Sequence, residues 1–186
     1  AGLALSISFP ALAASGEFQL EYRVQWGNSF LGRSIANWTI DEQSYRLQGT
    51  AISEGALSFF YDFEGKNELS GQIIDGAYLP QQFSSDSTYN DDGYVTNVEW
   101  VDDETRPSYS VMPEPELDEV HSLDPDTLDN VLDPFSAMLT ALSAFEKTGS
   151  CVGEYRIFDG RRRSNVTLVD LGTTTLEGDR TWSYKG

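Results

Sequence analysis

Histidine and cysteine, which carry much of the nucleophilic and metal chemistry of proteins, are almost missing from this chain. Among 186 residues there is one histidine, His121, and one cysteine, Cys151. No G-x-S-x-G elbow, H-E-x-x-H helix or C-x-x-C pair occurs, and the acidic runs lack the spacing of a calcium loop. A hydrolase is therefore the function class that the sequence favours least. We expect a protein that is not an enzyme and holds no metal and no cofactor.

Basic residues are also scarce, since 12 lysines and arginines face 30 aspartates and glutamates and leave a net charge of −18. This charge repels the phosphates of DNA and RNA and anionic lipid surfaces, so nucleic acid is excluded as a partner. Two interpretations of the charge stay open. It keeps the protein soluble, or it meets a specific cationic partner.

A hydrophobic run long enough to span a bilayer is missing as well. The first thirteen residues, AGLALSISFPALA, carry no charge but are too short to cross a membrane. They end in a small-x-small pattern, Ala11 to Ala13, which is typical of a signal-peptide cleavage site. We expect residues 1–13 to be the remnant of a secretory signal and residues 14–186 to form one exported, periplasmic domain. The alternative is a small buried first strand.

The single thiol of Cys151 is unusual in an exported protein, where an odd cysteine suggests a partner elsewhere. The last residues, RTWSYKG, look like a strand cut off in mid-course. We therefore expect the domain to be truncated at its C-terminus and the disulfide partner of Cys151 to lie beyond residue 186. A buried free thiol is the alternative.

Aromatic residues and glycines are abundant, with 10 Phe, 9 Tyr, 4 Trp and 16 Gly. The stretch EFQLEYRVQW alternates apolar and polar residues without fault, which is typical of a half-buried antiparallel strand. Gly65 and Gly71 fall on one strand face and favour a bent sheet. Similar patterns, with turns at Asp75-Gly76, Asp91-Asp92-Gly93 and Asp159-Gly160, predict strands over residues 17–26, 31–40, 45–52, 63–74, 79–89, 94–101, 108–112, 154–158 and 161–171.

One segment has a helical pattern, DPFSAMLTALSAF from Asp133 to Phe145. Asp133 suits the N-cap, Pro134 the first turn and Gly149 the end of the helix. Its apolar stripe, Phe135, Met138, Leu139, Leu142 and Phe145, needs a surface to pack against. The sequence thus predicts a mainly β fold: a curved antiparallel sheet or partly closed β-barrel with one α-helix at its mouth or concave face. The preceding residues 112–133, acidic and containing His121, are expected to be a long surface connection.

An open sheet with one helix often encloses an apolar cavity that binds lipid-like molecules. The residues predicted to line such a cavity are Trp26, Trp38, Phe59, Phe60, Phe63, Phe135, Met138, Leu139 and Leu142. The alternative for these side chains is an ordinary packed core.

The run Arg161, Arg162 and Arg163 holds three of the twelve basic residues, directly after a turn. On a strand, Arg161 and Arg163 share a face and Arg162 takes the other, so at least one guanidinium should point to the concave side. It would hold the anionic head of a ligand, or pair structurally with Glu154, Asp159 or Asp170.

The blocks DPFSAMLTAL and IFDGRRRSNVTL, with Cys151 between them, resemble domain-of-unknown-function family 3108, a bacterial family of exported domains. The resemblance extends from LEYRVQWGNSFLGRS to WSYKG. It implies an envelope protein with a secretion signal, no established enzymatic activity, and a second cysteine soon after Tyr184. Ser164 departs from the pattern, where an aromatic residue is commoner. The expected architecture is also similar to that of periplasmic lipoprotein carriers, an analogy at fold level.

Two functions follow as hypotheses. The first is a non-enzymatic periplasmic protein that binds an apolar or amphiphilic envelope ligand, such as a lipid or a lipoprotein acyl chain. The alternative is a structural or adaptor protein of the cell envelope that meets a protein partner through the acidic connection or the FDGRRR hairpin. A hydrolase comes third.

Overall fold

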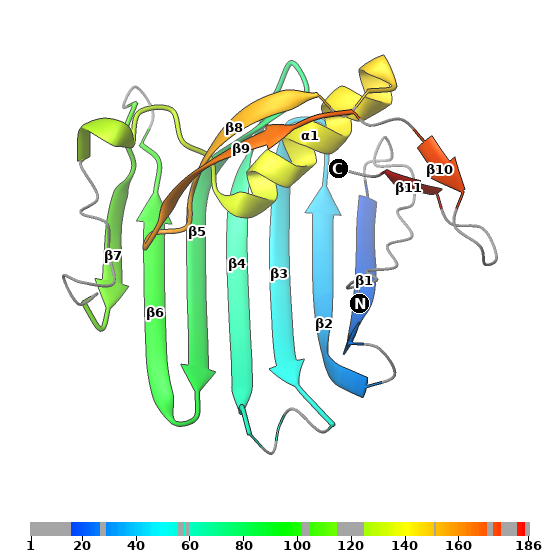
Figure 1. Ribbon diagram of the computed structural model, residues 1–186. Helices are drawn as coiled ribbons and strands as arrows, with labels where there is room; N and C mark the ends of the chain where they lie inside the picture. The colour runs from blue at the N-terminus through cyan, green and yellow to red at the C-terminus, as the bar shows by residue number, and fades with distance from the viewer. Residues whose placement is uncertain are drawn as a thin grey trace.

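The computed structural model describes residues 16–26, 29–55, 58, 60–101, 105–114, 125–150, 152–170, 173–175 and 182–184. Seven antiparallel strands form one sheet, in the order in which they follow one another in the chain (Figure 1). Within the described residues the first and last of these strands are not paired, so the sheet is open and not a closed barrel. The strands are β1 (Gly16–Trp26), β2 (Ser29–Ile40), β3 (Ser44–Ser53), β4 (Phe63–Ile74), β5 (Ala77–Tyr89), β6 (Asp92–Glu99) and β7 (Ser108–Met112).

Two-residue turns connect the central strands. Asp75 and Gly76 have φ values of 53° and 78°, which suit a tight hairpin between β4 and β5, as predicted. The next turn differs from the prediction, because Asn90 and Asp91 occupy it with φ values of 47° and 79°. Asparagine and aspartate tolerate this left-handed conformation better than most residues. Gly93 is therefore left free to lie within β6.

The remaining elements follow the sheet. A 3-10 turn, η2 (Pro125–Thr127), leads to helix α1 (Pro134–Thr148), which is followed by a hairpin of β8 (Gly153–Phe158) and β9 (Arg163–Leu168). Figure 1 shows α1, β8 and β9 crossing one face of the sheet near one end of its strands. Strands β10 (Thr173–Thr175) and β11 (Trp182–Tyr184) pair with each other in a separate small sheet. The predicted class, a mainly β chain with a curved antiparallel sheet and one helix, is confirmed.

The main core lies under the helix and the hairpin. Neighbouring strands contribute a row of large apolar side chains in register, and Leu139 of α1 and Phe158 of β8 pack onto this row. The row is Trp38, Leu47, Leu69, Phe83 and Val98, each between 0 and 4% exposed. This end of the sheet is therefore filled with protein side chains.

Helix α1 begins and ends where the sequence predicts. Asp133 accepts hydrogen bonds from the main-chain N–H groups of Phe135 and Ser136, and Gly149 ends the helix in the left-handed conformation with φ 70°. The face that meets the sheet overlaps the predicted stripe, since Leu139 is buried and Phe135 packs against the core, but it also includes Ser136 and Ala137, while Met138 is 37% exposed. The sheet presents large tyrosines to the helix at this end, so small side chains allow the closer approach.

Candidate functional site

The far end of the same sheet face carries small side chains. Ser34, Ala51, Gly65 and Ser87 lie opposite one another on four successive strands, β2 to β5. They share the face of the core residues, because side chains that point to one face of a strand recur at every second position. We call these four residues the small-residue row. Tyr22 on β1 and Tyr94 on β6 continue it at its two ends.

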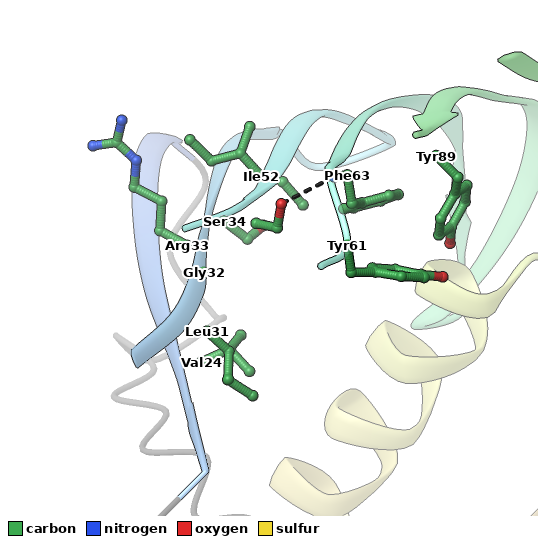
Figure 2. A pocket seen from close by; sticks show the side chains of 11 residues that line it. Val24, Leu31, Gly32, Arg33, Ser34, Ile52, Tyr61, Phe63 and Tyr89 are labelled. Atoms are coloured by element: carbon green, nitrogen blue, oxygen red, sulfur yellow. Dashed lines mark hydrogen bonds between the residues drawn. The ribbon is translucent and has the colours of Figure 1, made fainter. Parts of the chain in front are cut away.

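An apolar pocket of about 250 Å³ opens at the β2–β3 side of this row. In Figure 2, Val24 and Leu31 face Phe63, Tyr61 and Tyr89 across the open space. Leu31 has no partner in the β1–β2 register, which shifts at this point, so the irregularity brings an extra apolar side chain to the pocket. The full lining is Val24, Leu31, Gly32, Arg33, Ser34, Ala51, Ile52, Ser53, Tyr61, Phe63 and Tyr89.

Three aromatic rings, those of Tyr61, Phe63 and Tyr89, border the apolar pocket, and Tyr94 extends this group of rings. The ring centroid of Tyr89 lies 4.8 Å from that of Phe63, 5.4 Å from that of Tyr61 and 5.7 Å from that of Tyr94. Burial raises the pKa of the Tyr89 phenol, so this hydroxyl stays neutral. We call Tyr61, Phe63, Tyr89 and Tyr94 the aromatic ledge. It runs from β4 to β6, away from the apolar pocket.

The ledge ends at a second, more polar pocket of about 280 Å³. The guanidinium carbon of Arg161 lies 5.3 Å from the ring centroid of Tyr94, and Tyr89 lines both pockets. We call this second space the arginine pocket. It is lined by Phe83, Ser85, Ser87, Tyr89, Tyr94, Thr96, Asp159 and Arg161.

Arg161 lies in the turn that connects β8 to β9. The Asp159 carboxylate accepts the main-chain N–H groups of Arg161 and Arg162, at 2.8 and 2.6 Å, so strand β9 starts only at Arg163. The prediction that all three arginines alternate along a strand is therefore wrong. The Arg161 side chain extends over the sheet, where its Nη2 donates to the carbonyl oxygens of Met112 at 2.9 Å and Pro113 at 3.3 Å.

Among the described residues that the sequence predicted for the site, two line these pockets, one in each. Phe63 borders the apolar pocket and Arg161 lines the arginine pocket. Trp38 and Leu139 lie in the packed core instead, 4% and 2% exposed, because the register places them under the helix. Phe60 is 84% exposed, outside both pockets.

Helix residues contribute to neither of these two pockets. Phe135 packs against Phe83 of the core with ring centroids 6.5 Å apart, Leu142 is half-buried, and Met138 is exposed. Arg162 is exposed and Arg163 lies opposite Phe158 in the hairpin. The predictions that concern residues 1–13, His121, Phe59, Cys151 and the side chain of Trp26 lie outside the described residues.

Sequence reasoning missed most residues of the two pockets. The available signal was weak: small residues at every second position, as in Ser34-x-Ala36, Gly49-x-Ala51 and Ser85-x-Ser87. Each pair alone is unremarkable. Only the register of four strands places them side by side.

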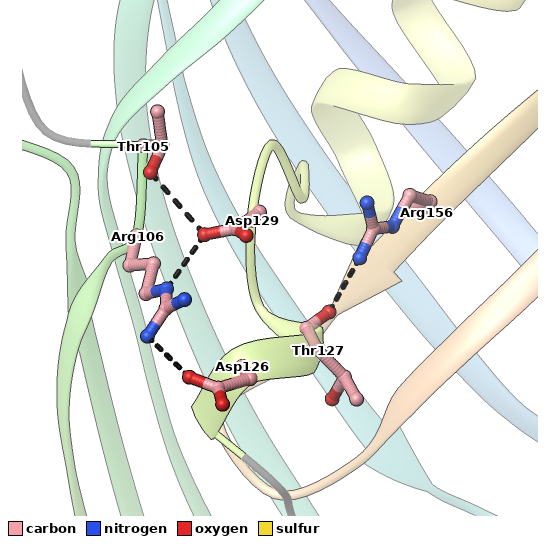
Figure 3. Close-up of polar contacts among 6 residues, drawn as sticks. All are labelled: Thr105, Arg106, Asp126, Thr127, Asp129 and Arg156. Carbon is pink, nitrogen blue, oxygen red and sulfur yellow. Dashed lines mark hydrogen bonds and ion pairs between the residues drawn. The ribbon is translucent and has the colours of Figure 1, made fainter.

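In its described residues the predicted surface connection is exposed at residues 112–114 but partly packed just before the helix. Leu128 and Val131 are each 2% exposed. As Figure 3 shows, Arg106 binds Asp126 at 2.9 Å and Asp129 at 2.6 Å. The hydrogen bond from Arg106 holds the pKa of Asp129 below its usual range. This segment fixes the start of α1 and offers a partner less free surface than the sequence indicated.

The D-P-x-S-A block forms a buried polar contact at the N-terminus of α1. Ser136 Oγ donates to the carboxylate of Asp133 and lies 2.5 Å from the hydroxyl of Tyr45. Burial raises the pKa of Asp133 and that of Tyr45. Since Ser136 is 0% exposed, no substrate reaches it. The block connects the N-terminus of the helix to the sheet.

Metal and membrane features were also sought in the described part of the chain. There, no cluster of three or more histidine, cysteine, aspartate or glutamate side chains is arranged to hold a metal ion. Among the same residues, no helix has the length and apolar character needed to span a membrane.

Comparison with known proteins gives one result. No curated protein and no solved structure matches the chain significantly. A family model described as "Protein of unknown function (DUF3108)" matches residues 21–185, nearly the whole chain. The match extends over every strand of the main sheet, the helix and the FDGRRR hairpin. The chain therefore belongs to the DUF3108 family, as the DPFSAMLTAL and IFDGRRRSNVTL blocks predicted.

Proposed function

We propose that this protein is a non-enzymatic periplasmic binding protein whose ligand is a small amphiphile with a single acyl chain. The chain lies in the apolar pocket and along the small-residue row. The observation that carries the proposal is the apolar pocket of about 250 Å³ beside the small-residue row of the sheet. Export and the periplasmic location rest on the signal-like sequence of residues 1–13.

The dimensions suit an extended hydrocarbon chain. Four neighbouring strands carry the small-residue row, and three strand spacings correspond to about 14 Å. Each methylene removed from water contributes about 0.8 kcal/mol, so a chain laid over this row has enough contact to bind. The aromatic ledge gives the chain one apolar wall.

A fluorescent fatty acid, dansyl-undecanoic acid, is the probe for this site. Ala51→Leu fills the row between Ser34 and Gly65 and should weaken probe binding at least about tenfold, the effect of roughly 1.4 kcal/mol. Thr50→Leu is the matched control, because Thr50 is the preceding residue of β3 and points to the opposite face. The control should bind the probe as the unaltered protein does.

Mass spectrometry of the natively purified protein gives an independent test, since a bound amphiphile should copurify. Equal probe affinity of Ala51→Leu and Thr50→Leu, or no probe binding by the unaltered protein, would contradict the proposal.

A further inference from the structure

We infer that the ligand carries an anionic group, a carboxylate or a phosphate, and that Arg161 binds this group in the arginine pocket. The inference rests on the proposed function, because it assigns the polar end of the same ligand. It goes further in naming the charge of the head group and the residue that selects it.

The guanidinium of Arg161 is held in place before any ligand arrives. Its Nη2 is bonded to the carbonyl oxygens of Met112 and Pro113, and its plane neighbours the ring of Tyr94, 5.3 Å from the guanidinium carbon. These contacts use one nitrogen. Both paired edges of a guanidinium include Nη2, so Nη1 and Nε serve as single donors, and each can give a charge-assisted hydrogen bond to a carboxylate or phosphate oxygen.

The one acid among the described residues that line the arginine pocket, Asp159, is bonded to the main chain. Asp159 Oδ1 accepts two main-chain N–H groups, those of Arg161 and Arg162. Among the salt bridges between described residues, none joins the Arg161 side chain to a carboxylate. An anion from outside is therefore a suitable partner for this charge.

The two pockets are spaced as the two ends of one amphiphile. From Ser34 on β2 to Tyr94 on β6 there are four strand spacings, or about 19 Å. The aromatic ledge connects the pockets, and Tyr89 borders both. The arginine end is the more polar of the two, because Ser85, Ser87, Thr96, Asp159 and Arg161 are in its lining. An acyl chain in the apolar pocket thus places its head group at Arg161.

The net charge of −18 opposes an anionic ligand at long range. In about 0.1 M salt this repulsion is screened over roughly 10 Å. Charge-assisted hydrogen bonds to a guanidinium act at contact and are much less screened, so they decide the preference.

The test compares dansyl-undecanoic acid with its methyl ester, which has the same chain and no charge. The unaltered protein should bind the acid about tenfold more tightly than the ester. Arg161→Gln should remove this preference and leave the affinity for the ester unchanged. Arg46→Gln is the matched control, since it removes the same charge from an exposed residue of β3 on the opposite face, and it should keep the preference.

The outcomes separate the inference from the proposed function. If the unaltered protein binds neither probe, the proposed function fails. If it binds both equally, or if Arg161→Gln keeps the preference, the assignment of the anion to Arg161 is overturned while the binding function stands. If Arg161→Gln weakens the binding of the acid and of the ester equally, the assignment is also overturned. Arg161 would then support binding only by holding the β8–β9 hairpin in place, and not by contacting the charged group.

Two additional measurements complete the design. Arg161→Lys keeps the charge without the fork and should retain part of the preference for the acid. Competition by a single-chain phosphate monoester and by an unlabelled fatty acid shows which of the two anionic groups Arg161 prefers. If neither competitor displaces the labelled acid from the unaltered protein, the anionic assignment fails.

Discussion

The hydroxyl of Tyr45 on β3 lies 2.5 Å from the hydroxyl of Ser136 on α1, and both groups are buried. Ser136 also donates to the carboxylate of Asp133, the N-cap of the helix. This chain of polar groups connects the sheet to the helix inside an otherwise apolar contact. It fixes α1 at one end of the strands, and the other end of the same face is left to the two pockets.

Removing either hydroxyl should destabilise the fold by different amounts. Ser136→Ala leaves the buried Tyr45 hydroxyl and Asp133 carboxylate without their partner, so we expect a loss of about 1 to 3 kcal/mol in the free energy of unfolding. Tyr45→Phe removes one hydrogen bond and should cost about 1 kcal/mol. Urea denaturation of both variants and of the double variant measures the coupling between them. Strict additivity would mean that the two hydroxyls do not interact.

Asp133 should make the stability depend on pH in an unusual direction. Burial raises its pKa in the folded protein, so the folded state holds the proton more tightly than the unfolded state does. Its contribution is fully present below the unfolded-state pKa and is lost as the pH rises through the folded-state pKa. Relative to Asp133→Asn, the unaltered protein should therefore gain stability as the pH falls from about 7 to about 4.

Asp129 is a control, because its effect on the pH dependence of stability should be opposite to that of Asp133. The hydrogen bond from Arg106 lowers its pKa in the folded state, so its contribution is present above the unfolded-state pKa and is lost as the pH falls through the folded-state value. Relative to Asp129→Asn, the unaltered protein should lose stability below about pH 4. Urea titrations at a series of pH values measure both differences. Parallel curves for the two variants would contradict the assignment of Asp133.

The helix could be predicted in detail because its signals are local. Asp133, Pro134 and Gly149 specify its two ends through contacts within a few residues. The apolar stripe predicts only part of its buried face, Leu139 and Phe135, since the partner surface on the sheet decides which other side chains are covered. Ser136 is buried because it lies against Tyr45 of the sheet, with the two hydroxyls 2.5 Å apart.

The two pockets were not predictable for a related reason. They depend on strand register, which joins residues that are distant in sequence, such as Ser34, Ala51 and Ser87. The sequence draws attention to Arg161 because basic residues are scarce in this acidic chain. The direction of its side chain over the sheet depends on the geometry of the turn at Asp159, and this geometry is not evident from the sequence. The strands could be predicted because the alternation of apolar and polar residues is visible within each segment of the sequence by itself.

Gly160 in the FDGRRR turn should not tolerate a side chain. Its φ is +89°, and an added Cβ would lie 2.1 Å from Cγ2 of Thr96 on β6. We expect Gly160→Ala to lower the free energy of unfolding by about 1 to 3 kcal/mol and to loosen the hairpin. Gly93→Ala is the control, because a Cβ there meets nothing within 4 Å. Urea denaturation compares the two, and similar losses would show that the close approach of Gly160 to β6 is unimportant.

The connection before α1 should depend on its apolar residues more than on its ion pairs. Leu128 is 2% exposed, so Leu128→Ala should cost about 2 to 5 kcal/mol. The Arg106 side chain is 44% exposed, and its two ion pairs are close to solvent, so Arg106→Gln should lower the free energy of unfolding much less than Leu128→Ala does. Thermal or urea unfolding of each variant measures these losses. A larger loss for Arg106→Gln would mean that the charges, and not burial, hold this segment.

The substitution Gly65→Ala tests, without changing any charge, whether the acyl chain lies along the small-residue row. A Cβ at this position would lie 2.8 Å from Cζ of Phe63, so Gly65→Ala must push the Phe63 ring along the aromatic ledge. The moving atom is the end of a rotatable side chain, and the stability should change by less than about 1 kcal/mol. Binding of dansyl-undecanoic acid and of its methyl ester should both weaken several-fold, because both chains follow the same path.

Gly49→Ala is the matched control for this change. Gly49 lies on the same face, and the nearest atoms to an added Cβ are main-chain oxygens at 3.8 and 3.9 Å, which is ordinary contact. This variant should bind both probes nearly as well as the unaltered protein. If Gly49→Ala weakens binding as much as Gly65→Ala does, the chain does not pass beside Phe63. An unchanged affinity in Gly65→Ala leads to the same conclusion, because the displaced ring would then lie outside the ligand's path.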